Sequence, residues 1–302
     1  MLSRRSDGVL VKDSASLRKM IPFIMVGRNE AAVYFEQQLE VEEVLRYLKT
    51  KRESGEGPQI TFFHVILCSL VRVFGARPEL NRFVVGRRLY QRDGLEFSFA
   101  VKKSFRDDAT MTTVKIRFEA DDTIEKVAER IQEAIGVGRG TEQTTSEKEV
   151  SVLTRLPRFM LRLILWGQRL LDFYGLLPAS LIKPDPMYAS MFLANLGSIG
   201  LDAPFHHLFE YGTIPFFAVI GRIKKAPVVD QESGEMRVSD VVNIKYTFDE
   251  RITDGFYCAR SLALLESFFQ DPSQLEQPPD PEALRERIKD AGLQRLRSKK
   301  SS

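Results

Sequence analysis

The order of helix-forming and strand-forming segments predicts an α/β domain of the layered α+β kind, with helices packed on a mixed sheet. Two observations support this class. Strand-like and helix-like runs are interspersed along the 302 residues without the strict alternation that a purely parallel sheet requires. The hydrophobic share of 43% and the charged share of 28% are ordinary for a globular chain, so one large core or two fused lobes can form.

Three helices and one strand are predicted in the first 75 residues. Serines precede an apolar run at helical spacing, and Pro22 fits the first turn of the helix that begins there. The next segments alternate in the period of a half-buried strand and then return to helical character, ending at Gly75. The predicted elements are a helix from Ser16, a strand at Tyr34–Val41, and helices at Glu42–Arg52 and Ile60–Phe74.

The middle and the end of the chain are rich in predicted strands. Runs of β-branched and aromatic residues are separated by short turn-forming segments, which is typical of a strand meander. The predicted strands are Val84–Tyr90, Glu96–Val101, Thr112–Phe118, Ala189–Leu196, Phe216–Ile223 and Val241–Phe248. An amphipathic helix is expected at Ile124–Ile135, and the polar segment Gly136–Lys148 is expected to be a loop.

An apolar helix within about residues 151–178 carries a stripe of arginines. Arg155, Arg158, Arg162 and Arg169 recur at spacings of three, four and seven, which places them on one helical face among otherwise apolar positions. Three hypotheses remain open for it. The helix covers the core or a neighbouring subunit, lies on a membrane surface through residues 155–171, or forms the wall of a pocket for a long acyl chain.

Composition excludes several classes of function. The net charge of +3 provides no strong field for nucleic acid, so no nucleic acid partner is expected. The two cysteines, Cys68 and Cys258, lack metal-ligand spacing, so neither a zinc site nor a disulfide framework is expected. The sequence shows no secretory signal and no apolar run of the roughly 20 residues that span a bilayer. We therefore expect a cytoplasmic protein, at most peripheral to a membrane.

Several motifs occur together in one chain order. They are S-L-R-K-M-I at residues 16–21, R-P-E-L-N at 77–81, D-G-L at 93–95, N-L-G-S-I-G at 195–200, G-R-I at 221–223 and D-E-R-I-T-D-G at 249–255. Together they resemble the catalytic domain of the 2-oxoacid dehydrogenase dihydrolipoyl acyltransferases, within the chloramphenicol acetyltransferase-like superfamily. The resemblance extends over residues 14–272. It leaves residues 1–13 as an N-terminal extension and residues 273–302 as a peripheral helix with a basic tail.

The resemblance implies a chloramphenicol acetyltransferase-like fold and a homotrimer, or a multiple of trimers, with active sites between subunits. The family's signature histidine accepts a thiol proton, and Glu250 stands in its place. A family serine that donates a hydrogen bond to the oxyanion is replaced by Ala194. Because an ordinary glutamate titrates about four units below a thiol, the usual thiol mechanism is expected to be lost or altered.

The resemblance also assigns roles to neighbouring residues. Asp254 matches the signature aspartate and is expected to form a buried structural ion pair with Arg18, in support of Glu250 as the catalytic group. Removing one partner of such a pair typically costs about 3–5 kcal/mol. The substrate-binding positions implied by the N-L-G motif are Ala194, Asn195, Gly197 and Ser198.

Three histidines and one cysteine offer further candidates. His206 and His207 suggest a replacement base, or metal ligands together with Glu210, but adjacent residues diverge on regular elements and no motif matches. We interpret both as structural histidines and expect no metal. His64 is expected in the core. Cys258 follows the signature closely, although a buried hydrophobic role is the commoner use of a free cysteine.

Two functions are consistent with these observations. The first is an acyltransferase-type enzyme that binds coenzyme A, acyl-coenzyme A or a carrier-borne acyl group as substrate and holds no tightly bound cofactor. The second is a non-catalytic trimeric scaffold or ligand-binding pseudoenzyme of the same fold. No lipoyl-bearing domain precedes Ser14 in this sequence. We therefore expect the acyl group to arrive on a small molecule or a separate carrier protein.

Overall fold

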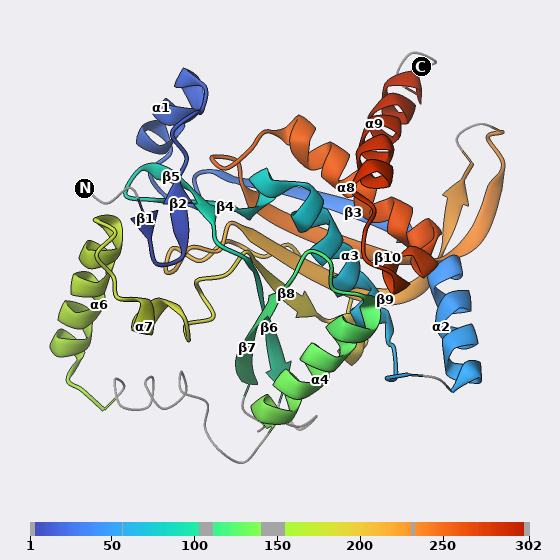
Figure 1. Cartoon of the computed structure of the whole chain (residues 1–302), viewed down its shortest axis with the longest axis horizontal. Coiled ribbons are helices and arrows are strands. Elements are labelled where there is room, and N and C mark those ends of the chain that lie inside the picture. Colours follow the sequence, from blue (N-terminus) through green and yellow to red (C-terminus); the bar gives the residue numbers. More distant parts are fainter. Residues whose placement is uncertain (1–3, 56, 103–110, 140–154, 231–232, 299–302) are drawn as a thin grey trace.

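The computed structural model describes residues 4–55, 57–102, 111–139, 155–230 and 233–298. Its strands form two sheets, and some of its helices lie by the larger sheet while others lie beside the smaller one (Figure 1). The strands are β1 (Arg4–Arg5), β2 (Gly8–Leu10), β3 (Ala32–Glu40), β4 (Arg82–Val85), β5 (Arg88–Arg92), β6 (Leu95–Lys102), β7 (Met111–Phe118), β8 (Met191–Asn195), β9 (Phe216–Val229) and β10 (Met236–Asp249). The helices are α1 (Ser16–Ile24), α2 (Glu42–Ser54), α3 (Phe62–Ala76), α4 (Ile124–Arg139), α6 (Arg158–Phe173), α7 (Ala179–Ile182), α8 (Gly255–Gln270) and α9 (Pro281–Ser298).

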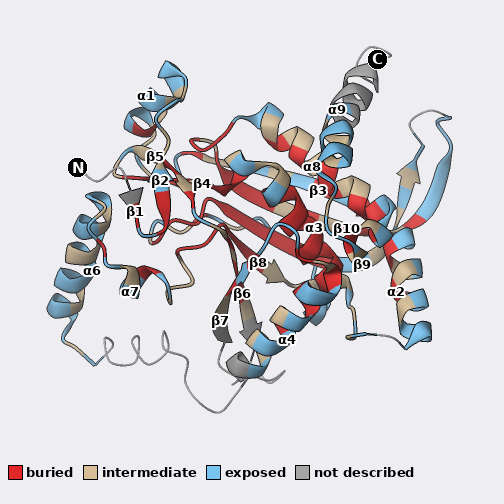
Figure 2. Cartoon of the chain, in the orientation of Figure 1, coloured by how far each residue is buried: buried red, intermediate tan, exposed pale blue. Residues whose placement is uncertain are grey.

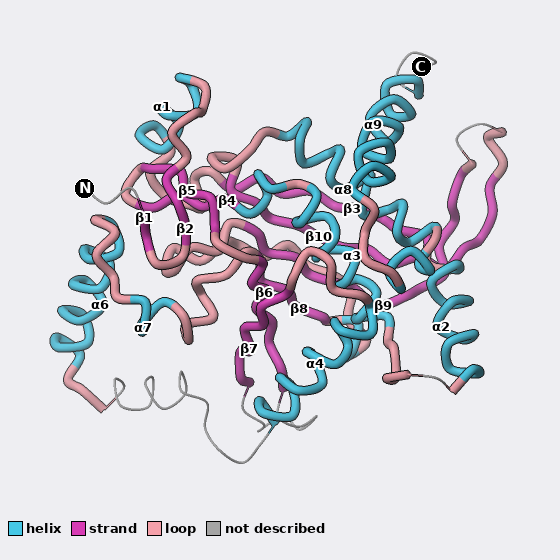
Figure 3. The backbone as a smooth tube through the Cα atoms, in the orientation of Figure 1, coloured by secondary structure: helices cyan, strands magenta, loops and turns pink. Residues whose placement is uncertain are grey.

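The larger sheet has six strands in the order β3-β10-β9-β8-β6-β7. Strand β8 runs parallel to β6 and β9, and the other neighbouring pairs are antiparallel. The predicted mixed sheet is therefore confirmed. The β9–β10 hairpin reaches well beyond the helices that cover the sheet (Figure 3).

One face of this sheet carries the main core. Helices α2, α3, α4 and α8 bring their apolar residues onto it, and α3 is buried along most of its length (Figure 2). Alternate residues of the same strands, such as Phe192 and Phe217, point to the opposite face because strand side chains alternate. There the chain between β8 and β9 packs through Ala203, Leu208 and Ile214.

The smaller sheet has the order β1-β2-β5-β4. Its first two strands come from the N-terminal extension, which thus takes part in the fold. The single strand predicted at Val84–Tyr90 is wrong, because Gly86 and Arg87 adopt positive φ angles of 57° and 58° and turn the chain into a hairpin. A β-carbon on Gly86 would lie 2.2 Å from the carbonyl oxygen of Phe173, which explains glycine there.

Several helices differ in detail from the predictions. Pro22 lies in the second half of α1 instead of its first turn, where its missing N–H leaves the helix without the bond to the Arg18 carbonyl oxygen. Helix α3 continues past Gly75 to Ala76. Helix α4 extends to Arg139, so the predicted loop begins later than Gly136, and residues 140–148 lie outside the described part of the chain. Among the described helices, none combines the length and the apolar character needed to span a membrane.

Candidate functional site

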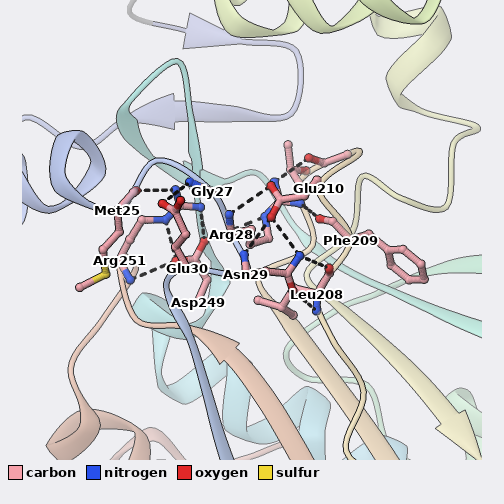
Figure 4. Close-up of polar contacts among 12 residues, drawn as sticks. Met25, Gly27, Arg28, Asn29, Glu30, Leu208, Phe209, Glu210, Asp249 and Arg251 are labelled. Atoms are coloured by element: carbon pink, nitrogen blue, oxygen red, sulfur yellow. Dashed lines mark hydrogen bonds and ion pairs between the residues drawn. The ribbon is translucent and has the colours of Figure 1, made fainter. Parts of the chain in front are cut away.

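The D-E-R-I-T-D-G segment begins where β10 ends and stops where α8 begins. Its first residue, Asp249, is 1% exposed and accepts two hydrogen bonds from the Arg251 guanidinium, at 2.8 and 2.7 Å. Arg251 also donates to the carbonyl oxygens of Met25 and Val26 (Figure 4). The two residues that flank Glu250 are thus fixed by a buried ion pair that ties β10 to the end of α1.

Glu250 is held by its backbone while its side chain stays half-buried. Its N–H donates to the carbonyl oxygen of Ala31 at 2.9 Å. Within the described residues, its carboxylate makes no hydrogen bond and no ion pair. The glutamate therefore has a defined position and a carboxylate that is available to a substrate or to a group outside this subunit.

A second polar cluster fastens the loop before β3 to the loop before β9. Arg28 is buried and donates to the carbonyl oxygens of Phe209 and Gly212, while its Nε lies 4.0 Å from Asp249 (Figure 4). Burial lowers the pKa of Arg28, and the charge of Asp249 opposes that shift. Sequence reasoning missed this arginine. Its only signal is a charged residue among the polar residues of a short connection.

Glu210 completes the same cluster. Its carboxylate accepts hydrogen bonds from the backbone N–H groups of Arg28 and Asn29 and from the Asn29 side chain. Burial would raise the pKa of Glu210, but these donors outweigh it and lower the pKa. The carboxylate is therefore committed to a structural contact instead of joining a metal site with the neighbouring histidines.

Asp254 begins α8 and contacts Arg18. It accepts a hydrogen bond from the Tyr257 N–H at 2.8 Å as the helix N-cap, and its Oδ2 lies 3.7 Å from Nη2 of Arg18. The side chain of Asp254 is 62% exposed, so the expected burial of this pair is wrong. The other terminal nitrogen of Arg18, Nη1, is buried and has no hydrogen-bond partner among the described residues.

The R-P-E-L-N turn contacts the D-E-R-I-T-D-G segment and the start of α8. Thr253 donates to the carboxylate of Glu79 at 2.7 Å, and the guanidinium of Arg77 lies 3.5 Å from the ring centre of Tyr257 in α8. The R-P-E-L-N and D-E-R-I-T-D-G motifs thus form one structural unit beneath Glu250.

The N-L-G loop follows β8 and turns tightly against β9. The N–H of Ser198 donates to the Asn195 side chain, and the Ser198 hydroxyl donates to the Asn195 carbonyl oxygen. A β-carbon on Gly197 would lie 2.5 Å from the Gly221 carbonyl oxygen, so only glycine allows this approach. Ala194 is the fourth residue of β8 and half-buried.

Glu250 and this loop are separated along the strand direction of the sheet. Ala194 pairs with Val219, and Val219 pairs with Lys245 of β10. Glu250 is five residues further along the chain, a distance of about 17 Å in a strand. A single subunit therefore brings Glu250 close to the Asp254–Arg18 pair but does not bring it to Ala194, Asn195, Gly197 and Ser198.

The histidines and cysteines show structural environments. The His206 ring stacks on Phe217 with centres 3.9 Å apart, and the Nδ1 atoms of His206 and His207 contact backbone carbonyl oxygens. Burial raises the pKa of both Cys258 and Cys68 to about 12, so these thiols stay protonated. No cluster of metal-ligating side chains occurs in the described chain.

A cavity of about 240 Å³ lies beside the signature, between the end of α1, the β4–β5 turn and α6. Apolar and charged side chains share its wall, and the charged ones are Arg28, Arg87, Arg169, Arg251, Glu210 and Asp172. Most of the large apolar side chains of α6 are exposed on the outside of the molecule. The helix therefore does not form an apolar wall for a long acyl chain at this cavity.

Comparison with known proteins confirms the resemblance and the fold class. Residues 181–276, which include the N-L-G and D-E-R-I-T-D-G segments, match the family model of the 2-oxoacid dehydrogenases acyltransferase (catalytic domain). No curated protein sequence gives a significant match.

Solved structures match over most of the chain. A probable dihydrolipoamide acetyltransferase from Listeria monocytogenes superposes with a TM-score of 0.57 at 17% identity, covering 86% of this chain and 94% of that one. The dihydrolipoamide acetyltransferase of Azotobacter vinelandii gives 0.56 at 16% identity, covering 88% and 93%. A chloramphenicol acetyltransferase gives 0.51 at 13%, covering 87% and 98%. At these identities the likeness establishes the fold.

Proposed function

We propose that this chain is an acyltransferase whose active site is completed between two subunits of a trimer, or of a multiple of trimers. The observation that carries the proposal is the separation of Glu250 from Ala194, at the start of the N-L-G loop, by about 17 Å along the strand direction. A head-to-tail ring, in which each subunit contacts the next through a different surface, would bring the two halves together. The buried, unpartnered Nη1 of Arg18 lies in the Glu250 half, where a second subunit or a substrate can satisfy it.

The relatives support this arrangement. One of the solved structures of the same fold is the cubic core of the pyruvate dehydrogenase multienzyme complex. Work on the Azotobacter vinelandii enzyme addressed a serine, a histidine and an asparagine in its catalytic mechanism, the last two being four positions apart. Glu250 and Asp254 have the same spacing here.

The substrate we propose is coenzyme A, or an acyl group carried by coenzyme A or by a carrier protein. The cavity beside the signature presents four arginines and two carboxylates, an excess of positive charge that suits phosphate groups. Arg87 and Arg169 are exposed and turned toward it, whereas Arg28 and Arg251 are held by backbone carbonyl oxygens.

Glu250 is the proposed base, and its chemistry limits the acceptor. An ordinary carboxylate is a poor base for a thiol because their pKa values differ by about four units. An amine or water that attacks an activated thioester loses its proton late and requires less of the base. We therefore propose transfer to a non-thiol acceptor, with Ala194 contributing no oxyanion donor from its side chain.

The test combines binding and turnover. Calorimetry with acetyl-coenzyme A is expected to show binding, and a panel of acceptors is expected to show transfer to an amine or to water and none to dihydrolipoamide. The variant Glu250→Gln should bind equally well and transfer about 100-fold more slowly or worse, since a general base is worth that much. Its folding should be unaffected, because the carboxylate has no partner within the described subunit.

The competing hypothesis is a trimeric scaffold or ligand-binding pseudoenzyme. Tight binding without transfer to any acceptor would favour it, and the absence of a hydroxyl at Ala194 is the observation behind it. Efficient acetyl exchange between coenzyme A and dihydrolipoamide would contradict the proposed choice of acceptor. An unchanged rate in Glu250→Gln would remove Glu250 from the mechanism.

A further inference from the structure

Helix α6 is amphipathic, but its apolar face points away from the protein, whereas the apolar face of a surface helix usually packs on the core. It contains no buried residue, and its largest apolar side chains lie on the surface of the molecule (Figure 2). Phe159, Leu163, Trp166, Leu170 and Phe173 form an outward stripe at alternating spacings of four and three. Leu163 and Trp166 are 63% and 62% exposed. The hypothesis of a helix buried against its own core is therefore wrong for this subunit.

Polar contacts attach the opposite face of α6 to the protein. Asp172 binds the guanidinium of Arg5 at 2.7 Å and accepts a second bond from it through its carbonyl oxygen. Gln168 donates to the Tyr211 hydroxyl, which in turn donates to Asp185. These contacts fix the rotation of the helix, so the outward direction of its apolar stripe is set by specific interactions.

The charges beside the stripe indicate what covers it. Arg158 and Arg162 are exposed and lie along one flank of the stripe, whereas Arg169, further along the same flank, lines the cavity. Asp172 is the only acidic residue of α6, and Arg5 neutralises it. An apolar stripe with tryptophan and phenylalanine, bordered by arginines without acidic partners on the same helix, complements the anionic headgroups and acyl boundary of a lipid bilayer.

We propose that α6 docks the protein on the surface of an anionic membrane, with the apolar stripe at the acyl boundary and the arginines at the phosphates. Within the described part of the chain, the helix lies at the edge of the molecule, away from the six-stranded sheet (Figure 1), and its apolar stripe is exposed. Docking does not depend on acyl transfer. It would place the cavity behind α6 close to the membrane surface.

The single tryptophan of the chain lies in the stripe and reports on it directly. In buffer its emission should be that of an exposed indole. Vesicles of roughly one part phosphatidylserine to three parts phosphatidylcholine should shift it to shorter wavelength, and the protein should float with them. Pure phosphatidylcholine should bind at least about 10-fold more weakly, since the arginine contribution is lost.

Variants separate the two contributions. Leu163→Ser combined with Phe159→Ser should weaken flotation at least about 10-fold while retaining the reporter. Arg158→Glu combined with Arg162→Glu should remove the preference for phosphatidylserine. The matched control is Met236→Ser with Val238→Ser on the β9–β10 hairpin, two positions that are 72% and 67% exposed, and it should bind like the native protein.

Two results would overturn the proposal. In the first, the tryptophan emission is already blue-shifted in buffer, shifts to longer wavelength on dilution and does not change when vesicles are added. This result would show that a second copy of the chain covers the stripe. Equal binding of the native protein and both α6 variants to anionic vesicles would show that another surface makes the contact. Native melting temperatures in the variants exclude misfolding as the cause of lost binding.

Discussion

The residues on either side of Glu250 hold the structure together, whereas Glu250 itself is the candidate for chemistry. Asp249 and Arg251 bury a bidentate ion pair that joins β10 to the end of α1, while Glu250 between them keeps a half-exposed carboxylate. The motif resemblance identified the segment, but it could not show which of its charged residues are buried. That division depends on the loop before β3, which is about 220 residues away in the sequence.

Substitutions of Asp254 measure how much the Arg18–Asp254 ion pair contributes to the free energy of unfolding. Its carboxylate caps α8 and is mostly exposed to solvent, so Asp254→Ala should destabilise the protein by about 1–2 kcal/mol through loss of the cap and little more. Asp254→Asn keeps a capping oxygen and should cost under about 1 kcal/mol. Urea unfolding measures both values. A loss of about 3–5 kcal/mol in Asp254→Ala would show that the pair behaves as a buried one.

At the scale of elements, periodicity predicted α2, α3, α4, α6 and the central strands, but it did not predict the core helix α8. It failed where a short element depends on its partner. Strands β1 and β2 contain two and three residues, and they form a sheet because β2 pairs with β5 and β1 pairs with β2. The β4–β5 turn was missed because Arg87 takes a left-handed conformation that sequence does not lead one to expect. Helix α6 was recognised, but its orientation depends on contacts with Arg5 and Tyr211.

The start of α3 should make stability depend on pH. Thr61 and His64 form a capping box in which the Thr61 N–H donates to Nδ1 of His64, so this nitrogen must be unprotonated. Burial lowers the pKa of His64 to about 4, below the value of about 6.5 in an unfolded chain. The unfolded state therefore gains a proton first as the pH falls. The stability present above pH 6.5 is lost toward pH 4, by about 3 kcal/mol.

The variant His64→Gln isolates this effect, because glutamine can form the same capping box and does not titrate. Urea unfolding of both proteins at pH 7 and near pH 4.5 should show a larger loss in the native protein. Carboxylates titrate in both proteins, so their contribution to the free energy of unfolding cancels when the two proteins are compared. Parallel losses would mean that His64 stays accessible to protons in the folded state.

At the scale of the whole molecule, the sheet register decides where chemistry can occur. The motifs predicted the fold and the candidate residues, yet the chain order does not reveal that Glu250 and Ala194 are separated along the strand direction. The pairing of β8 with β9 and of β9 with β10 establishes that separation. The proposed acyltransferase site uses both Glu250 and the N-L-G loop, so the proposal needs a second subunit to bring them together.

Mixed trimers test that claim most directly. Glu250→Gln removes the proposed base and leaves the loop intact, whereas Ser198→Trp obstructs the exposed loop and leaves Glu250 intact. Each variant alone should be inactive with the acceptor of the native enzyme. After subunit exchange in an equal mixture, about one quarter of the native rate should return, because each site takes one half from each neighbour at even odds. Mixed trimers that form, as seen by native mass spectrometry, and stay inactive would contradict a site shared between subunits.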